Sequence, residues 1–468
     1  MNPVPSSSQS SHAEKNTALL VATFASFLTP FMGAALNVAL PTIGTEFGAD
    51  AILLNLTATI YLLATAIFLL PFGRLGDILG RKKIFTSGIV IFTLATVAAA
   101  LSASITWLII TRVFQGLGSA MIFGTGVAIL TSVFPANERG KALGINVSAV
   151  YIGLASGPFA GGLLTQYFGW RSIFWVLVPL GILVFVMVKL KLKGEWAESR
   201  GEKFDWKGGL IYSFSLMFLM FGFSRVPELS GFIFMALGVF TLFVFIRFEL
   251  GLQMPLFEMR LFQANRVFVF SNLAALINYS ATFAVGFLLS LYLQYVKGYT
   301  PRDAGIIMIV QPLIMAAFSP VTGRLSDRIQ PQFLATTGMV LSTIGLVLLI
   351  FLGKNTSLAF IVTILAFLGA GFALFSSPNT NAIMGAVDRR YYGVASGAVG
   401  TMRMVGQMFS MGIVLLLFTL LIGKVKISPE TAELFLKSMH FAFILFAGLC
   451  FVGIFASLAR GKVGKMRE

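Results

Sequence analysis

Long apolar runs, separated by short polar or charged stretches, make up most of this chain of 468 residues. Each run is long enough for an α-helix to cross the roughly 30 Å hydrocarbon core of a bilayer. The pattern predicts an all-α integral membrane protein with 14 transmembrane helices. They are expected near residues 17–41, 51–74, 84–103, 105–133, 140–166, 172–190, 208–224, 230–248, 266–295, 303–322, 332–352, 357–384, 393–422 and 438–459.

Short sequences recur in order about half a chain apart. The stretch "GRLGDILGRKK" from Gly73 returns as "GRLSDRIQ" from Gly323, and "GLGSA" at Gly116 returns as "GAGFA" at Gly369. Such repeats predict two homologous bundles of six helices each, as in transporters whose substrate path lies between repeats. The expected organisation is a disordered tail at 1–16, bundles at 17–190 and 266–459, a linker with two extra helices at 191–265, and a basic tail at 460–468.

Composition supports the membrane assignment and limits the chemistry. Hydrophobic residues account for 57% of the chain and charged residues for 11%, whereas soluble domains carry roughly 25% charge. One cysteine and two histidines leave no cluster for a metal, and no cofactor is expected. The chain has no H-E-x-x-H or G-x-S-x-G element and no intramembrane carboxylate pair, so we expect no enzyme. A membrane sensor or scaffold is an alternative that no appended domain supports.

The net charge of +16 is explained by topology. Tails and loops on the side of the N-terminus hold 24 of the 34 basic residues, and the loops of the other side hold eight. Basic loops remain in the cytoplasm, so both termini are expected there, in a multi-pass protein of the plasma membrane. The expected partners are the lipid bilayer and a small-molecule substrate; no nucleic acid is needed, and a monomer is expected.

The sequence "GRLGDILGRKK" resembles the signature loop between the second and third helices of the major facilitator superfamily. Glycines there allow close approach to neighbouring helices, and Asp77 can meet a helix N-terminus or a basic partner. Basic residues from Arg81 onward also satisfy the charge rule for cytoplasmic loops. A conformational role is expected for Gly73, Asp77, Gly80, Arg81, Arg139, Gly323 and Asp327.

The fifth span contains "YIGLASGPFAGG", with small residues at four-residue spacing. Its elements Gly153, Gly157, Pro158, Gly161 and Gly162 resemble a motif of drug antiporters in the same superfamily. Ordinary close packing of helices is the alternative explanation for the glycines. With fourteen spans, the chain resembles the 14-helix drug-efflux group, the drug/proton antiporters. That resemblance implies export by alternating access.

Two arginines lie well within spans. Arg112 is followed by Gln115 in an "R-x-x-Q-G-x-G" pattern that resembles the family's fourth-helix motif for proton coupling, and Arg403 is followed by Gln407. A charge at this depth needs partners or a functional role; the alternative for Arg112 is a packing arginine bonded to backbone carbonyls. Further candidates for substrate or coupling contacts are Asn37, Asn146, Asn278 and Gln311.

The chain departs from the efflux family in its acidic residues. Met32 stands where the family has an acid in its first helix, and none of the 18 acidic residues lies in the middle of a span. A proton remains a candidate coupling ion, but the usual carboxylate for it is missing. We therefore expect an exporter of small drug-like or metabolite molecules, anionic or neutral. The alternative is a transporter or exchanger of an organic or inorganic anion bound by Arg112 and Arg403.

Overall fold

The computed structural model describes residues 12–252, 254–387, 392–423, 427 and 431–461, and these form helices joined by short connections. Fourteen helical spans among them are long and apolar enough to cross a membrane, which confirms the predicted count. The elements are α1 (His12–Phe47), α2 (Ala51–Leu79), α3 (Arg81–Ala100), α4 (Ile105–Val133), α5 (Ala136–Phe168), α6 (Arg171–Lys191), α7 (Trp206–Arg225), α8 (Leu229–Gly251), α9 (Arg260–Ala264), α10 (Arg266–Thr282), α11 (Ala284–Leu291), the π-helix η1 (Tyr292–Val296), α12 (Pro301–Met308), α13 (Val310–Arg328), α14 (Pro331–Leu349), α15 (Leu358–Gly385), α16 (Tyr392–Leu421) and α17 (Ala432–Ala459).

Local sequence explains where many helices begin. Asp50, Ser104 and Ser357 each precede a long apolar run, and each side chain accepts a hydrogen bond from the backbone N–H three residues on. This N-cap satisfies one of the donors that a helix start leaves free. Within the runs, helix formation pairs every interior backbone group, as a span without water requires.

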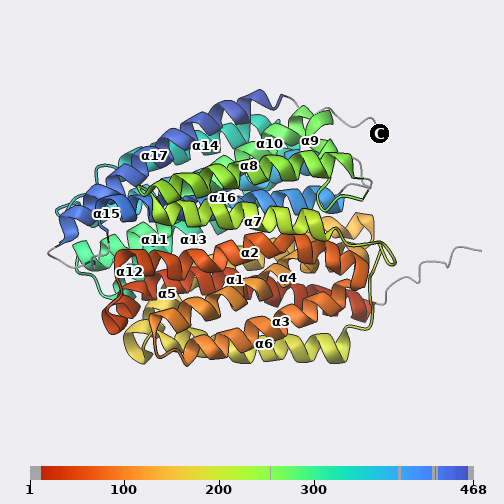
Figure 1. Cartoon of the computed structure of the whole chain (residues 1–468), viewed down its shortest axis with the longest axis horizontal. Coiled ribbons are helices and arrows are strands. Elements are labelled where there is room, and N and C mark those ends of the chain that lie inside the picture. Colours follow the sequence, from red (N-terminus) through yellow and green to blue (C-terminus); the bar gives the residue numbers. More distant parts are fainter. Residues whose placement is uncertain (1–11, 253, 388–391, 424–426, 428–430, 462–468) are drawn as a thin grey trace, which may run out of the picture.

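The helices lie side by side along one axis, in two groups (Figure 1). Helices α1–α6 pack on one another as the N-terminal half, and α10–α17 with η1 form the C-terminal half. In the extra pair, α7 packs against α2 and α16, one helix from each half, and α8 packs on α7. The start of α1 and the end of α17 lie at the same end of the molecule, here called the basic end; the other is the opposite end (Figure 1).

Several boundaries differ from the expected ones. Helix α1 starts at His12, so residues 12–16 belong to it and not to a disordered tail. Lys15 forms an ion pair with Glu138 of α5 at 2.9 Å, which holds this first turn against the N-terminal half. The ninth span consists of α10, α11 and η1, and the tenth of α12 and α13, because local irregularities interrupt both runs.

Candidate substrate path and conformational motifs

Arg112 lies enclosed within the N-terminal half. It comes from α4, is 1% exposed, and donates from Nε to Thr57 O of α2 at 3.3 Å and from an Nη to Gln115 Oε1 at 2.9 Å. Its guanidinium also stacks over the Tyr61 ring, 4.2 Å from the centroid. Gln115 in turn donates to Thr96 Oγ1 of α3 at 2.8 Å. The network therefore joins α2, α3 and α4 without a carboxylate.

Arg403 has a different environment, between the two halves. It comes from α16, is half-buried, and its guanidinium lies 5.5 Å from the centre of the Phe123 ring of α4. Its Nε is buried without a hydrogen-bond partner, and in the part of the chain that the structure describes it forms no ion pair. Phe123 follows Arg112 by 11 residues on α4, roughly 16 Å of helix. The two arginines therefore do not share one site.

Aromatic and hydroxyl side chains lie near Arg403. Tyr151 of α5 shares a hydrogen bond of 2.9 Å with Ser376 of α15, which links the two halves near mid-span. Tyr151 also lies within electrostatic range of Arg403 and Tyr279. We call the set Phe123, Tyr151, Tyr279, Ser376 and Arg403 the Arg403 cluster. It offers a cation, three hydroxyls and aromatic faces between the halves.

The predicted amides divide into two groups. Asn146 and Asn278 are buried, at 4% and 0% exposure. Among the residues that the structure describes, both amide atoms of Asn278 and Oδ1 of Asn146 have no hydrogen-bond partner. The half-buried group is Asn37, Gln311 and Gln407. The structure thus brings Arg112 and Gln115 together, as their spacing suggested, but does not gather all the candidates around one position.

The segment that resembles the family's signature loop is mostly helical. Gly73 lies in the last turns of α2, which ends at Leu79, and Gly80 alone forms the turn before Arg81 begins α3. Gly80 has φ = 117°, a backbone conformation that glycine adopts without the Cβ penalty. The expected connection across 75–83 is therefore too long, since Gly80 alone connects the two helices.

Arg81 and Asp77 are the polar centre of this turn. Arg81 is 7% exposed and donates from Nε to Asp77 Oδ1 at 2.8 Å, so Asp77 has the basic partner that was one of its two expected contacts. The linker 192–205 docks on the pair: Glu198 forms an ion pair with Arg81 at 2.8 Å, and Ser199 N donates to Asp77 O at 3.0 Å. Arg81 therefore contributes to the positive charge of this end and also holds the linker against the turn between α2 and α3.

The second copy of this element is described only in part. A Cβ on Gly323 of α13 would lie 3.1 Å from Ser377 Oγ of α15, so the glycine allows a close approach between these helices. Asp327 and Arg139 lie on helices, but their side chains are outside the described part of the structure.

The glycines of α5 pack against two different neighbours. Gly153, Gly157 and Gly161 face α1, and a Cβ on Gly153 would lie only 2.8 Å from Phe27 O. Gly162 instead faces the C-terminal half, where a Cβ would lie 2.5 Å from Pro301 O at the start of α12. The carbonyl of Pro158 meets Gly305 of the same helix, which has no room for a Cβ.

Hydrogen bonds between α1 and the C-terminal half are concentrated at the opposite end. Ser290 donates to Asn37 O at 2.6 Å, and Gln294 donates to Val38 O at 2.9 Å. Tyr295 adds a hydrogen bond to Pro41 O at 3.2 Å. Together with the contact of α5 and α12, these bonds close the two halves against each other at that end.

Comparison with known proteins agrees with this architecture. The model of the Major Facilitator Superfamily matches residues 22–411 and 271–465, in two overlapping segments. The chain belongs to this superfamily. It is therefore a multi-pass transporter of the plasma membrane and not an enzyme.

Named relatives of this transporter handle different molecules. Riboflavin transporter RibZ of Clostridioides difficile is 32% identical over 394 residues, which cover 83% of this chain and 85% of that protein. Multidrug resistance protein Stp of Mycobacterium tuberculosis is 30% identical over 395 residues, 83% of this chain and 73% of Stp. The structure of a bacterial homologue of the lysosomal transporter Spinster, described as inward-facing and unoccupied, matches with a TM-score of 0.70 and 17% identity, covering 96% of this chain and 98% of that one. The last match shows the shared fold.

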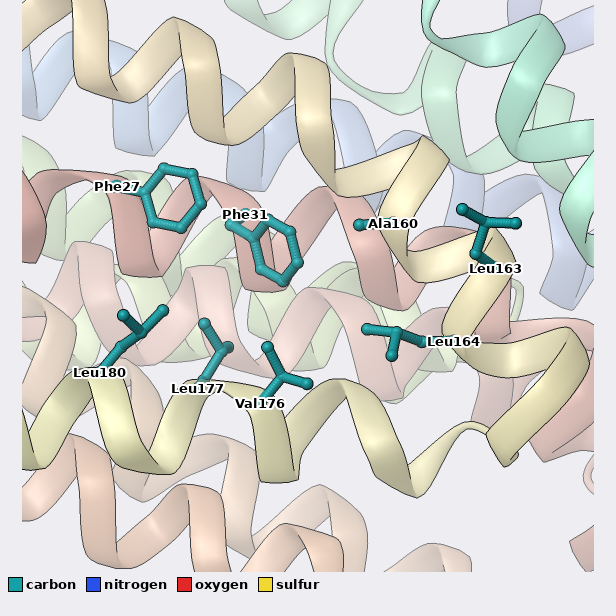
Figure 2. A pocket seen from close by; sticks show the side chains of 8 residues that line it. All are labelled: Phe27, Phe31, Ala160, Leu163, Leu164, Val176, Leu177 and Leu180. Carbon is teal, nitrogen blue, oxygen red and sulfur yellow. The ribbon is translucent and has the colours of Figure 1, made fainter.

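An apolar groove on the transporter lies away from the path between the halves. Figure 2 shows it between α1, α5 and α6, all from the N-terminal half. Val176 at its edge is 41% exposed, so the groove opens on the outer face of the bundle, where lipid chains lie. It is lined by Phe27, Phe31, Ala160, Leu163, Leu164, Val176, Leu177 and Leu180.

Sequence reasoning missed most of the Arg403 cluster. Tyr151 is the first residue of the quoted glycine motif, and Phe123 and Tyr279 belong to a large background of 47 phenylalanines and ten tyrosines. No spacing rule distinguishes an aromatic residue between the halves of the transporter from one that faces lipid. The one usable signal was the position of Tyr151, an aromatic residue at the start of the glycine motif in the fifth span, which also borders the C-terminal half.

Proposed function

We propose that the transporter exports a small amphiphilic molecule, neutral or anionic, by alternating access between its two halves, as a monomer. The observation that carries the proposal is Arg403, a half-buried cation between the halves with no acidic partner among the described residues. An unpaired charge in a membrane protein marks a substrate or ion pathway more often than a packing contact. The printed names of RibZ and Stp, a riboflavin transporter and a multidrug resistance protein, support a metabolite or drug-like substrate.

Charge at the core argues against a cationic substrate. Met32, in the position of the family's acid, is 0% exposed and packs in the hydrophobic core. A lipophilic cation bound near Arg403 would meet a like charge in a medium of low dielectric constant. A carboxylate or a polarised carbonyl would instead receive charge-assisted hydrogen bonds from the guanidinium.

The contacts at the opposite end support alternating access. Both halves contribute to them, through α1 with α11 and η1 and through α5 with α12. If the basic end faces the cytoplasm, as its positive charge favours, this arrangement is closed toward the outside. Export then requires these contacts to open and the basic end to close, with the substrate at the Arg403 cluster between them.

Transport into liposomes tests the proposal. Purified protein is reconstituted, and matched amphiphiles of similar size carrying a carboxylate, no charge or a quaternary ammonium are offered, with and without an imposed pH gradient. We expect movement of the anionic and neutral compounds, and loss of anion movement in Arg403→Ala. Accumulation of the quaternary ammonium compound driven by the pH gradient would contradict the proposal.

Exchange of organic or inorganic anions is a second candidate, favoured by the same unpaired guanidinium. The sequence suggested that both arginines bind the anion. Because Arg112 is enclosed by its own hydrogen bonds, we propose Arg403 alone as the anion ligand. Liposomes preloaded with the anion separate the two functions. Exchange requires anion on both sides of the membrane, whereas export proceeds into an empty compartment.

A further inference from the structure

Two carboxylates meet at the basic end, where the chain enters α7 and leaves α8. Asp205 is the N-cap of α7, and its Oδ1 accepts a hydrogen bond from Gly208 N at 3.0 Å. Glu249, in the last turn of α8, is 1% exposed, and its Oε2 accepts from Phe257 N at 2.9 Å. The remaining oxygens, Asp205 Oδ2 and Glu249 Oε1, are both buried, and neither has a hydrogen-bond partner in the described part of the chain.

The two unpaired oxygens point to the same place. A Cβ at Gly208 would clash with both Asp205 Oδ2 and Glu249 Oε1, so the glycine leaves room for the carboxyl groups to approach each other. The Asp205 carboxyl is close enough to Glu249 to act on it electrostatically. The geometry is that of a carboxyl pair, in which one oxygen carries a hydrogen and donates it to the other.

The surroundings supply no cation to neutralise the pair. Among the described residues, neither Asp205 nor Glu249 forms an ion pair with a lysine or arginine. Arg74 of α2 is paired with Glu202 at 2.5 Å, and Arg260 donates to Leu252 O at 3.0 Å. The other titratable or charged groups nearest to the pair along the chain are Lys203 in the linker, Lys207 and Tyr212 on α7, Arg247 on α8 and Glu258 beyond it.

We propose that Asp205 and Glu249 hold one proton between Oδ2 and Oε1, and that this proton fastens the two linkers flanking the α7–α8 pair to each other. The proton is taken from bulk water and forms an O–H that donates to the facing oxygen. When it returns to water, two buried negative charges face each other and repel. The site is a proton-binding position outside the membrane core, which lacks acidic residues.

The position gives the shared proton a conformational consequence. Asp205 ends the linker that docks on the α2–α3 turn, through Glu198 with Arg81 and Glu202 with Arg74. Glu249 is tied to the other linker through Phe257 N. Loss of the proton therefore loosens the linker 192–205 from α8 and weakens its hold on the turn that joins α2 and α3.

Hydrogen exchange on the full chain in nanodiscs tests this directly. Exchange of peptides covering 192–207 is compared at about pH 6 and about pH 9, after correction for intrinsic rates, because opening of a segment raises its exchange. We expect the wild-type protein to lose roughly tenfold protection at the higher pH, a change of about 1.4 kcal/mol in opening free energy. Glu249→Gln keeps an acceptor for Phe257 N and gains a donor toward Asp205, so its protection should not change with pH.

Asp205→Asn is the reciprocal variant. It retains Oδ1 as the helix cap and supplies a neutral donor toward Glu249, so it should also remove the pH response, and it tests the proposal if Glu249→Gln does not fold. Glu228→Gln, a neutral replacement of an exposed carboxylate at the opposite end, should respond as the wild type does. Equal protection of the wild-type linker at both pH values, or a full wild-type response in both variants of the pair, would overturn the proposal. The readout needs no substrate, so it is independent of the proposed transport function.

Discussion

Arg112 and Arg403 occupy similar positions in the sequence and contrasting positions in the molecule. Each lies well within a span and precedes a glutamine by one helical turn. Arg112 is 1% exposed and bound by Thr57, Gln115 and the Tyr61 ring, all from the N-terminal half. Arg403 is half-buried, and its main described contact is the Phe123 ring across the boundary between the halves.

From this difference we predict a mainly structural role for Arg112 and a role in transport for Arg403. A guanidinium whose partners all belong to one half moves with that half and keeps its contacts when the halves rock. A guanidinium at the boundary changes its neighbours during the same motion, because rigid-body rotation repacks only the interface. Substitutions at the two positions should therefore affect different properties of the transporter.

Replacing Arg112 should have the largest effect, and it should be on stability. Arg112→Ala leaves Thr57 O and Gln115 Oε1 buried without their donor, at a cost of roughly 3 kcal/mol in unfolding free energy. We expect a lower yield of folded protein and a lower melting temperature in detergent. Arg403→Ala is the matched control and should melt close to the wild type. Normal melting of Arg112→Ala together with complete loss of transport would instead assign Arg112 to the transport cycle.

Replacing Arg403 should be the largest purely functional change. Arg403→Ala should lower transport of an anionic amphiphile at least tenfold, about 1.4 kcal/mol, while a neutral one changes less than threefold. The reason is that Arg403 is the only cation in the Arg403 cluster as defined from the described residues, so no other positive charge there can bind an anion. Arg403→Lys should recover part of the anion transport, since the charge remains but the planar fork of donors does not. An equal loss of transport for the anionic and the neutral substrate would show that Arg403 does not distinguish substrates by charge.

The two glutamines repeat the contrast at lower magnitude. Gln115 connects Arg112 with Thr96 Oγ1, so Gln115→Leu breaks two buried hydrogen bonds and should cost roughly 2 kcal/mol of stability. Gln407 is half-buried, and Gln407→Leu should change stability by less than about 0.5 kcal/mol. Thermal melts of the two variants in the same detergent make the comparison. Equal destabilisation would mean that the glutamine of α16 has a comparable structural role.

Much of the fold could be predicted from the apolar runs alone, because a long apolar segment that crosses a bilayer pairs its backbone groups by forming a helix. The pattern indicated fourteen spans, and the repeat from Gly73 to Gly323 indicated two halves. It did not reveal that α1 begins at His12 or that Gly80 alone joins α2 to α3. Those features depend on single side-chain contacts and one backbone angle, to which hydropathy is insensitive.

The candidate site was less accessible from the sequence. Arg112 and Gln115 are hydrogen-bonded to each other, as residues three apart on one helix face can be. The same reasoning could not tell that Arg403 faces another half while Arg112 does not, because that depends on helix rotation in the bundle. Nor could it identify Asp205 and Glu249 as neighbours, since they are brought together by the packing of α7 on α8.

The smallest predicted effect comes from removing one tyrosine hydroxyl in each of the two regions, at the boundary between the halves and inside the N-terminal half. Tyr151→Phe removes a hydrogen bond of 2.9 Å to Ser376 that joins the halves, and Tyr61→Phe removes one of 2.7 Å to Ser119 within the N-terminal half. Each loss should cost about 1 kcal/mol of stability. If rocking of the halves breaks this bond, its loss should also shift the balance between transport states by up to about fivefold. Initial transport rates should therefore change in Tyr151→Phe and remain near wild type in Tyr61→Phe. If the two variants changed transport equally, the boundary between the halves would have no special place in the mechanism, and the contrast between the two arginines would lose its functional meaning.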